Sequence, residues 1–127
     1  MLDVTLITAA LLAFVNIWLG YRVGQIRTRE KVSLGDAGKP ALVARMRAHA
    51  NFGEYVPLPV ILIGLIEMAG AARTPLIVAG AALLVARVAH AYGMDRPAPN
   101  PLRMGGIVVT LAVTAGLAGW GLFLAYA

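Results

Sequence analysis

The sequence lacks cysteine, carries little charge and contains a single serine, Ser33. Without cysteine the chain can form no disulfide, no thiolate metal site and no cysteine nucleophile, so any sulfur chemistry must come from a ligand. No serine triad and no phosphate-cradling glycine loop can be assembled from the motifs present. These absences remove the most readily recognised classes of soluble enzyme.

What the chain has in abundance is apolar surface. Of its 127 residues 60% are hydrophobic and only 13% are charged, and the mean hydropathy is +0.79. A soluble domain of this size could not bury so much apolar surface. Apolar runs of about 20 residues, enough to cross a bilayer, recur along the chain. The sequence therefore predicts one compact membrane domain that crosses the lipid bilayer several times.

Four transmembrane helices are expected in an all-α, up-down-up-down bundle. The first is retained rather than cleaved as a signal peptide, because its apolar stretch is too long for a signal-peptide core. The residues before it include Asp3 and no basic residue. Pro57 and Pro59 fall inside the second helix and predict a kink there. The expected spans are residues 4–25, 41–69, 75–93 and 104–126.

The net charge of +5 reports orientation rather than nucleic-acid binding, because the basic residues lie between apolar segments. Most of them fall in the first and third loops, 26–40 and 94–103. By the positive-inside rule both termini lie outside the cytoplasm. Four helix ends then converge on the cytoplasmic side, including the polar start of the second helix.

At helical spacing Arg47, Asn51, Glu54 and Leu58 share one stripe of the second helix, with Tyr55 on its shoulder. A charge at the bilayer centre costs about 2.5–3.5 kcal/mol or more, so these groups should face the bundle interior, pair or bind a ligand. The simplest alternative needs no ligand. Glu54 pairs with an arginine, and Asn51 fills a hydrogen-bond gap between helices.

Several more donors are predicted at the same membrane face than one ion pair requires, and such an excess favours an anionic ligand. They are Arg27, Arg47, Arg87, Arg103, His49 and His90. The two histidines lie on different helices and lack carboxylates at ligand spacing, so no metal site is expected.

Segment 47–58, RAHANFGEYVPL, strongly resembles the signature of the membrane-associated proteins in eicosanoid and glutathione metabolism, the MAPEG family. Supporting matches are Val32-Ser33, Ala86-Arg87 and Leu102-Arg103. The resemblance implies a homotrimer with sites between neighbouring subunits and glutathione as co-substrate. The implied activity is that of a glutathione transferase or peroxidase acting on lipophilic electrophiles or hydroperoxides.

The resemblance also implies roles for individual residues. Arg103 would be catalytic by stabilising the glutathione thiolate. Arg87 would have a structural role and would hold the residues that contact the ligand. Within the signature, Glu54 would take the amino group of glutathione and Arg47 a carboxylate. The full implied glutathione-binding set is Arg27, Arg47, His49, Asn51, Glu54, Tyr55, His90 and Tyr92.

Two other functions remain open. A non-catalytic lipid-binding or scaffold protein on the same fold is suggested by His90 and Met94, which stand where relatives carry tyrosine. A small multidrug transporter has a similar length and four helices, but such transporters use an acidic residue deep in the first helix. The first helix of this chain has only Asp3, which lies near its end. The composition, rich in glycine and alanine, is typical of a bacterial inner-membrane protein.

Overall fold

The computed structural model describes all 127 residues and contains helices but no strands. Its five helices are α1 (Asp3–Glu30), α2 (Pro40–Tyr55), α3 (Pro57–Met68), α4 (Arg73–Met94) and α5 (Pro101–Tyr126). Because α2 and α3 follow one another as a single broken span, four spans are long and apolar enough to cross a membrane. The predicted four-helix membrane bundle is confirmed.

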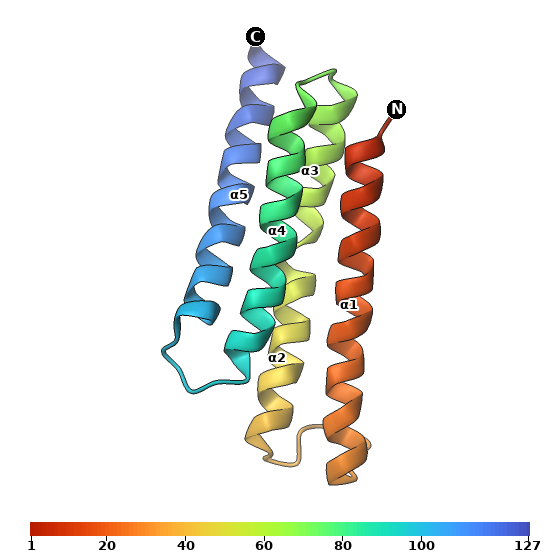
Figure 1. Cartoon of the computed structure of the whole chain (residues 1–127), viewed down its shortest axis with the longest axis vertical. Helices are drawn as coiled ribbons and strands as arrows, with labels where there is room; N and C mark the ends of the chain where they lie inside the picture. The colour runs from red at the N-terminus through yellow and green to blue at the C-terminus, as the bar shows by residue number, and fades with distance from the viewer.

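The spans run antiparallel (Figure 1). Both termini and the short α3–α4 turn lie at one end of the bundle, which we call the termini end. The α1–α2 and α4–α5 loops lie at the other end, which we call the loop end. The four helix ends that were predicted to converge therefore do lie at one end of the molecule.

The second span breaks at Val56, where the expected kink falls. Pro57 and Pro59 begin α3 and have no N–H to donate to the preceding turn, so the regular hydrogen-bond ladder cannot cross this point. The backbone of Val56 stays near the helical region, with φ of −85° and ψ of −37°. The break therefore bends the span without ending it.

Two helices begin or end more than two residues from their predicted limits. α1 continues past residue 25 to Glu30, and Arg27 and Arg29 in its last turn suit the negative end of the helix dipole. It stops at Lys31, which adopts the left-handed conformation. α5 starts at Pro101 rather than residue 104, because Asn100 caps it.

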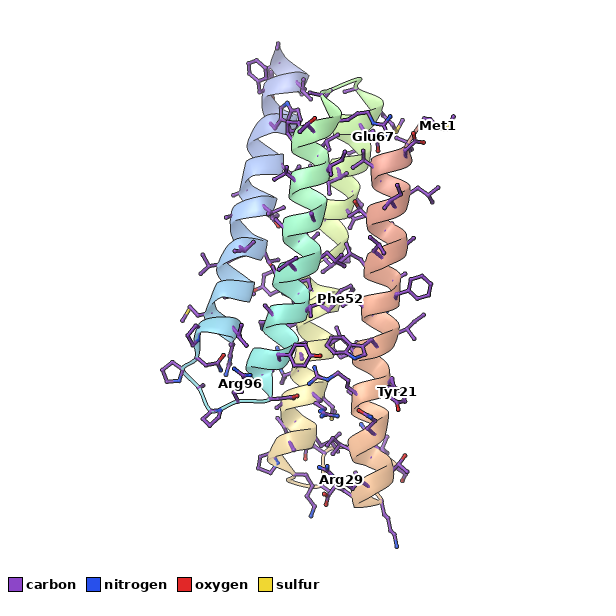
Figure 2. The ribbon with its side chains drawn as sticks, viewed as in Figure 1. Met1, Tyr21, Arg29, Phe52, Glu67 and Arg96 are labelled. Atoms are coloured by element: carbon purple, nitrogen blue, oxygen red, sulfur yellow. The ribbon has the colours of Figure 1, made fainter.

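Only 24 of the 127 residues are buried, and large apolar side chains cover the outside of the bundle. Such an exterior is suited to lipid rather than to water. Figure 2 shows this contrast between Tyr21, on the outside of α1, and Phe52, between the helices. The buried apolar residues form one cluster around Leu19 and Phe52 and another around Ile63 and Leu76.

Glycines bring α4 and α5 into close contact at the loop end. A Cβ atom on Gly106 would lie 2.6 Å from the Cβ of His90 and 2.7 Å from the carbonyl oxygen of Ala86. Gly93 similarly packs directly on the backbone of Arg103. This close approach sets His90 and Arg103 beside one another.

Candidate functional site

A pocket of about 360 Å³ lies at the loop end between α2, α4 and α5. Three of the predicted site residues line it: Asn51 from α2, His90 from α4 and Arg103 from α5. Its other lining residues are Ala98, Pro99, Asn100, Met104 and Ile107. The fold thus gathers residues separated by more than 50 positions into one cavity with both polar and apolar walls.

The α4–α5 loop fixes the position of Arg103. The side chain of Asn100 donates from Nδ2 to the carbonyl oxygen of Gly93 at 2.7 Å. Its Oδ1 accepts a hydrogen bond from the backbone N–H of Arg103 at 2.9 Å. One amide therefore caps α5 and ties it to the end of α4, while the Arg103 side chain stays exposed.

Arg87 lies directly behind the pocket and is 1% exposed. Its Nη2 donates to Asn51 Oδ1 at 2.6 Å and lies 3.4 Å from His90 Nδ1. Its Nε and Nη1 have no hydrogen-bond partner. A buried cation with unused donors makes its surroundings favourable for negative charge.

Arg47 and Glu54 lie on the outer face of α2, which faces away from the bundle, whereas Tyr55 is 37% exposed. Arg47 Nη2 is 3.6 Å from Glu54 Oε1, and the two side chains are 57% and 50% exposed. The expected pairing of Glu54 with an arginine is therefore present, as is the expected bridge from Asn51 to another helix. Arg47 and Glu54 do not face the interior of a single chain.

Three other predicted site residues point elsewhere in the single chain. Arg27 donates to the carbonyl oxygen of Gly35 at 2.8 Å and holds the first loop. His49 Nε2 lies 3.0 Å from Asn16 Oδ1, and the ring of Tyr92 packs on Trp18 at 5.5 Å between centroids. The pocket of one chain therefore contains neither Arg27 nor His49 nor Tyr92.

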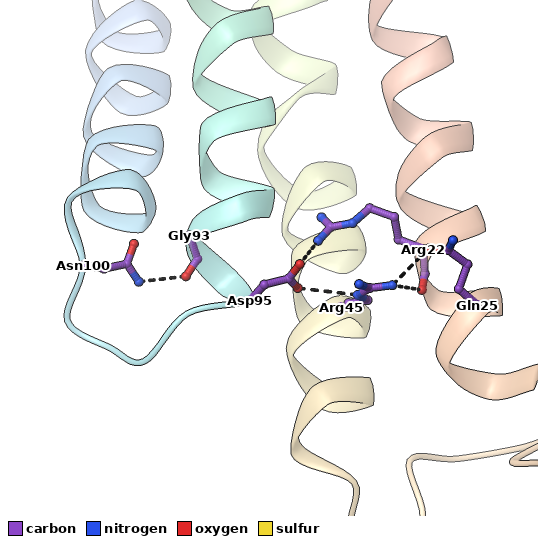
Figure 3. Close-up of polar contacts among 6 residues, drawn as sticks. All are labelled: Arg22, Gln25, Arg45, Gly93, Asp95 and Asn100. Carbon is purple, nitrogen blue, oxygen red and sulfur yellow. Dashed lines mark hydrogen bonds and ion pairs between the residues drawn. The ribbon is translucent and has the colours of Figure 1, made fainter. Parts of the chain in front are cut away.

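Sequence reasoning missed a charged cluster formed by Arg22, Arg45 and Asp95 (Figure 3). Arg22 is 5% exposed and forms an ion pair with Asp95. Arg45 Nε lies 3.5 Å from Asp95, and Arg45 Nη1 donates to the carbonyl oxygen of Arg22 at 2.9 Å.

The guanidinium of Arg22 also lies over the rings of Trp18 and Tyr92, at 4.8 Å and 5.4 Å from their centroids. A signal for the cluster was present in the sequence. An arginine inside the first span requires a partner, and Asp95 is the one acidic residue of the third loop.

Comparisons with known proteins agree with this architecture. The model of the MAPEG family matches residues 5–123. Inner membrane protein YecN of Escherichia coli strain K12 is 32% identical over 90 residues, which cover 71% of this chain and 69% of that protein. YecN of strain O6:H1 matches to the same extent. No solved structure matches significantly. The chain belongs to the MAPEG family.

Proposed function

We propose that this protein binds glutathione at the loop-end pocket and directs its thiol at a lipophilic electrophile or hydroperoxide, working as a homotrimer in a bacterial inner membrane. The observation that carries the proposal is the convergence of Asn51, His90 and Arg103 in one pocket. The buried Arg87 lies behind this pocket, with two nitrogen atoms that have no hydrogen-bond partner. The predicted orientation places this pocket on the cytoplasmic side, where glutathione is available.

The side chains present suit the groups of glutathione. The tripeptide has two carboxylates, an ammonium group and a thiol, and its net charge at neutral pH is negative. Arg47 and Arg103 offer guanidinium groups to carboxylates or to a thiolate, and Glu54 offers a carboxylate to the ammonium group. When bound, glutathione supplies a thiol that serves as nucleophile or reductant in its thiolate form.

The protein's own groups orient the ligand and favour its anionic form. Asn51 Oδ1 is occupied by Arg87, so the amide NH₂ of Asn51 is left to donate to a ligand. Arg103 lies at the first turn of α5, with its backbone fixed by Asn100 and its side chain exposed. A guanidinium placed there stabilises negative charge on a thiol within the pocket.

Apolar walls give a lipophilic substrate access. Met104 and Ile107 line the pocket on the α5 side, and the neighbouring surface of α5 is apolar and exposed. A substrate dissolved in the bilayer can therefore approach the polar groups along α5 without crossing water. This arrangement supports a lipophilic rather than a freely soluble second substrate.

A second copy would cover the charged pair that one chain leaves exposed on its outer face. The Arg47–Glu54 pair is exposed on an outer face of the bundle, and charges facing hydrocarbon are costly. A neighbouring subunit packed against α2 covers that face and can bring its own donors to it. The homotrimer that we propose provides such a neighbour.

The direct test adds glutathione to the purified protein and measures the ultraviolet absorbance of the thiolate, followed by turnover of an aryl halide and an alkyl hydroperoxide. We expect a saturable thiolate signal in the wild type and in Arg96→Gln, which changes an exposed arginine of the same loop outside this pocket. We expect loss of the signal in Arg103→Gln. Absence of glutathione binding in the wild type contradicts the proposal, and binding without thiolate or turnover favours the non-catalytic alternative.

A further inference from the structure

Asp95 occupies a position that the helix dipole disfavours. It is the C-terminal capping residue of α4, where a carboxylate faces the negative end of the dipole. Two arginines from other helices offset this effect, Arg22 from α1 and Arg45 from α2. We call these three residues the Asp95 clamp. The clamp joins the end of α4 to both helices that extend beyond it (Figure 3).

The clamp is built around a buried charge rather than a surface pair. Arg22 is enclosed by Trp18, Tyr92 and Asp95, and its Nη1 has no hydrogen-bond partner. Asp95 supplies the one carboxylate that Arg22 contacts. Removing that carboxylate leaves a buried cation without a counter-ion, so the surrounding elements must move to solvate it.

A short chain of contacts leads from the clamp to Arg103. Asp95 follows Gly93 by two residues. The carbonyl oxygen of Gly93 accepts from Asn100, and Asn100 accepts from the Arg103 backbone N–H. Gly93 also packs directly against the Arg103 backbone. A displacement of the end of α4 therefore displaces the first turn of α5.

We propose that the Asp95 clamp is a positioning device that sets Arg103 in the loop-end pocket by tying the end of α4 to α1 and α2. This inference rests on the proposed function for the role of Arg103 toward glutathione. The geometric part does not depend on any ligand. The two parts can therefore be tested separately.

The geometric test uses the absence of native cysteine. Cysteines introduced at Tyr21 and Met104, both exposed, carry spin labels in the full chain reconstituted in lipid nanodiscs. With the labelled chain diluted in unlabelled protein, so that label pairs within one subunit dominate, we expect one narrow distance distribution, broadened by Asp95→Asn. Asp36→Asn is the matched control, since Asp36 is an exposed acid of the first loop whose carboxylate accepts a hydrogen bond only from the Gly38 N–H. An unchanged distribution in Asp95→Asn overturns the clamp.

If Asp95→Asn does not fold, Arg45→Gln replaces it. This variant leaves the ion pair between the buried Arg22 and Asp95, and it removes the second partner of the carboxylate. We expect a smaller broadening of the same distance distribution. A distribution as narrow as that of the parent overturns the clamp in this case too.

The functional test separates positioning from general stability. At saturating glutathione we expect Asp95→Asn to lower kcat and the thiolate absorbance by roughly tenfold to a hundredfold, with little change in KM, because the geometry around Arg103 is lost while the binding groups remain. Asp95→Glu restores a carboxylate and should recover part of kcat. An unchanged kcat in folded Asp95→Asn overturns the proposed effect of the clamp on Arg103. Failure of the wild type to bind glutathione instead contradicts the proposed function. In that case the distance measurement alone decides whether the clamp exists.

Discussion

The two ends of the bundle treat their polar groups differently. At the termini end, Glu67 accepts from the backbone N–H of Val4 at 2.9 Å, from that of Thr5 at 2.8 Å and from the Thr5 hydroxyl at 2.6 Å. It thereby satisfies two of the free backbone N–H groups at the start of α1. Figure 2 shows Glu67 beside the start of the chain.

At the loop end, buried donors remain unused. Arg22 Nη1 and Arg87 Nε and Nη1 have no hydrogen-bond partner in the chain. Buried polar groups are normally paired, and unpaired ones are often found where a ligand binds or catalysis occurs. The termini end therefore pairs its carboxylate within the chain, whereas the loop end keeps buried donors free, as the proposed anionic ligand requires.

The largest effect is expected from removing the exposed cation of the pocket, Arg103, which tests whether the loop end handles a negative charge. We expect Arg103→Gln to lower kcat by about a hundredfold to a thousandfold, the usual effect of removing one group that stabilises developing negative charge. The free energy of unfolding should stay within about 0.5 kcal/mol of the wild type, because the side chain is exposed. Steady-state kinetics and thermal unfolding in detergent measure the two effects. A fall in kcat that is accompanied by a clear loss of stability contradicts the assignment.

Close packing between α4 and α5 gives a second large effect. Gly106→Ala places a Cβ 2.6 Å from His90 Cβ and 2.7 Å from the Ala86 carbonyl oxygen. Such overpacking should lower the free energy of unfolding by about 1–3 kcal/mol and should also disturb the pocket. Gly119→Ala on the same helix is the control, because its Cβ meets nothing within 4 Å. Similar unfolding temperatures for the two variants contradict the packing argument.

At the termini end, Glu67→Ala should affect stability alone. It removes three hydrogen bonds to the start of α1 and should lower the unfolding temperature more than Glu30→Gln does, because the donors of Val4 and Thr5 lose their partner. Glutathione binding should not change, since Glu67 lies at the opposite end from the pocket. Unfolding in detergent and a binding titration test this together, with Glu30→Gln as the control for an exposed carboxylate. A loss of binding would show that the two ends are coupled.

The sequence was sufficient for the spans, their order, the break near Pro57 and the stripe on α2, because all of these depend on local hydropathy and helical period. It was not sufficient for the Arg22–Asp95 pair, whose members are 73 positions apart. Nor did it predict that His49 faces Asn16, because the rotation of a helix is set by its packed neighbours. The start of α5 at Pro101 could have been predicted from the sequence, since Asn100-Pro101 is a helix-start signal.

A smaller effect on catalysis than that of Arg103→Gln is expected on the outer face of α2, where Arg47 can serve either an ion pair or a ligand. We expect Arg47→Gln to change the free energy of unfolding by no more than about 1 kcal/mol, as for other exposed ion pairs. The KM for glutathione should rise by about tenfold to a hundredfold, because a charge-assisted hydrogen bond to the ligand contributes about 1.5–3 kcal/mol.

A charge swap separates the two roles. In the double variant Arg47→Glu with Glu54→Arg the ion pair can form again with its ends exchanged, so a purely structural pair is restored. A ligand whose carboxylate and ammonium group are each read by one of these side chains meets the wrong charge at both positions. We therefore expect the double variant to unfold like the wild type and to bind glutathione no better than Arg47→Gln. Recovery of the wild-type KM in the double variant would assign the pair to structure alone and would confine the binding site to the pocket beside Asn51.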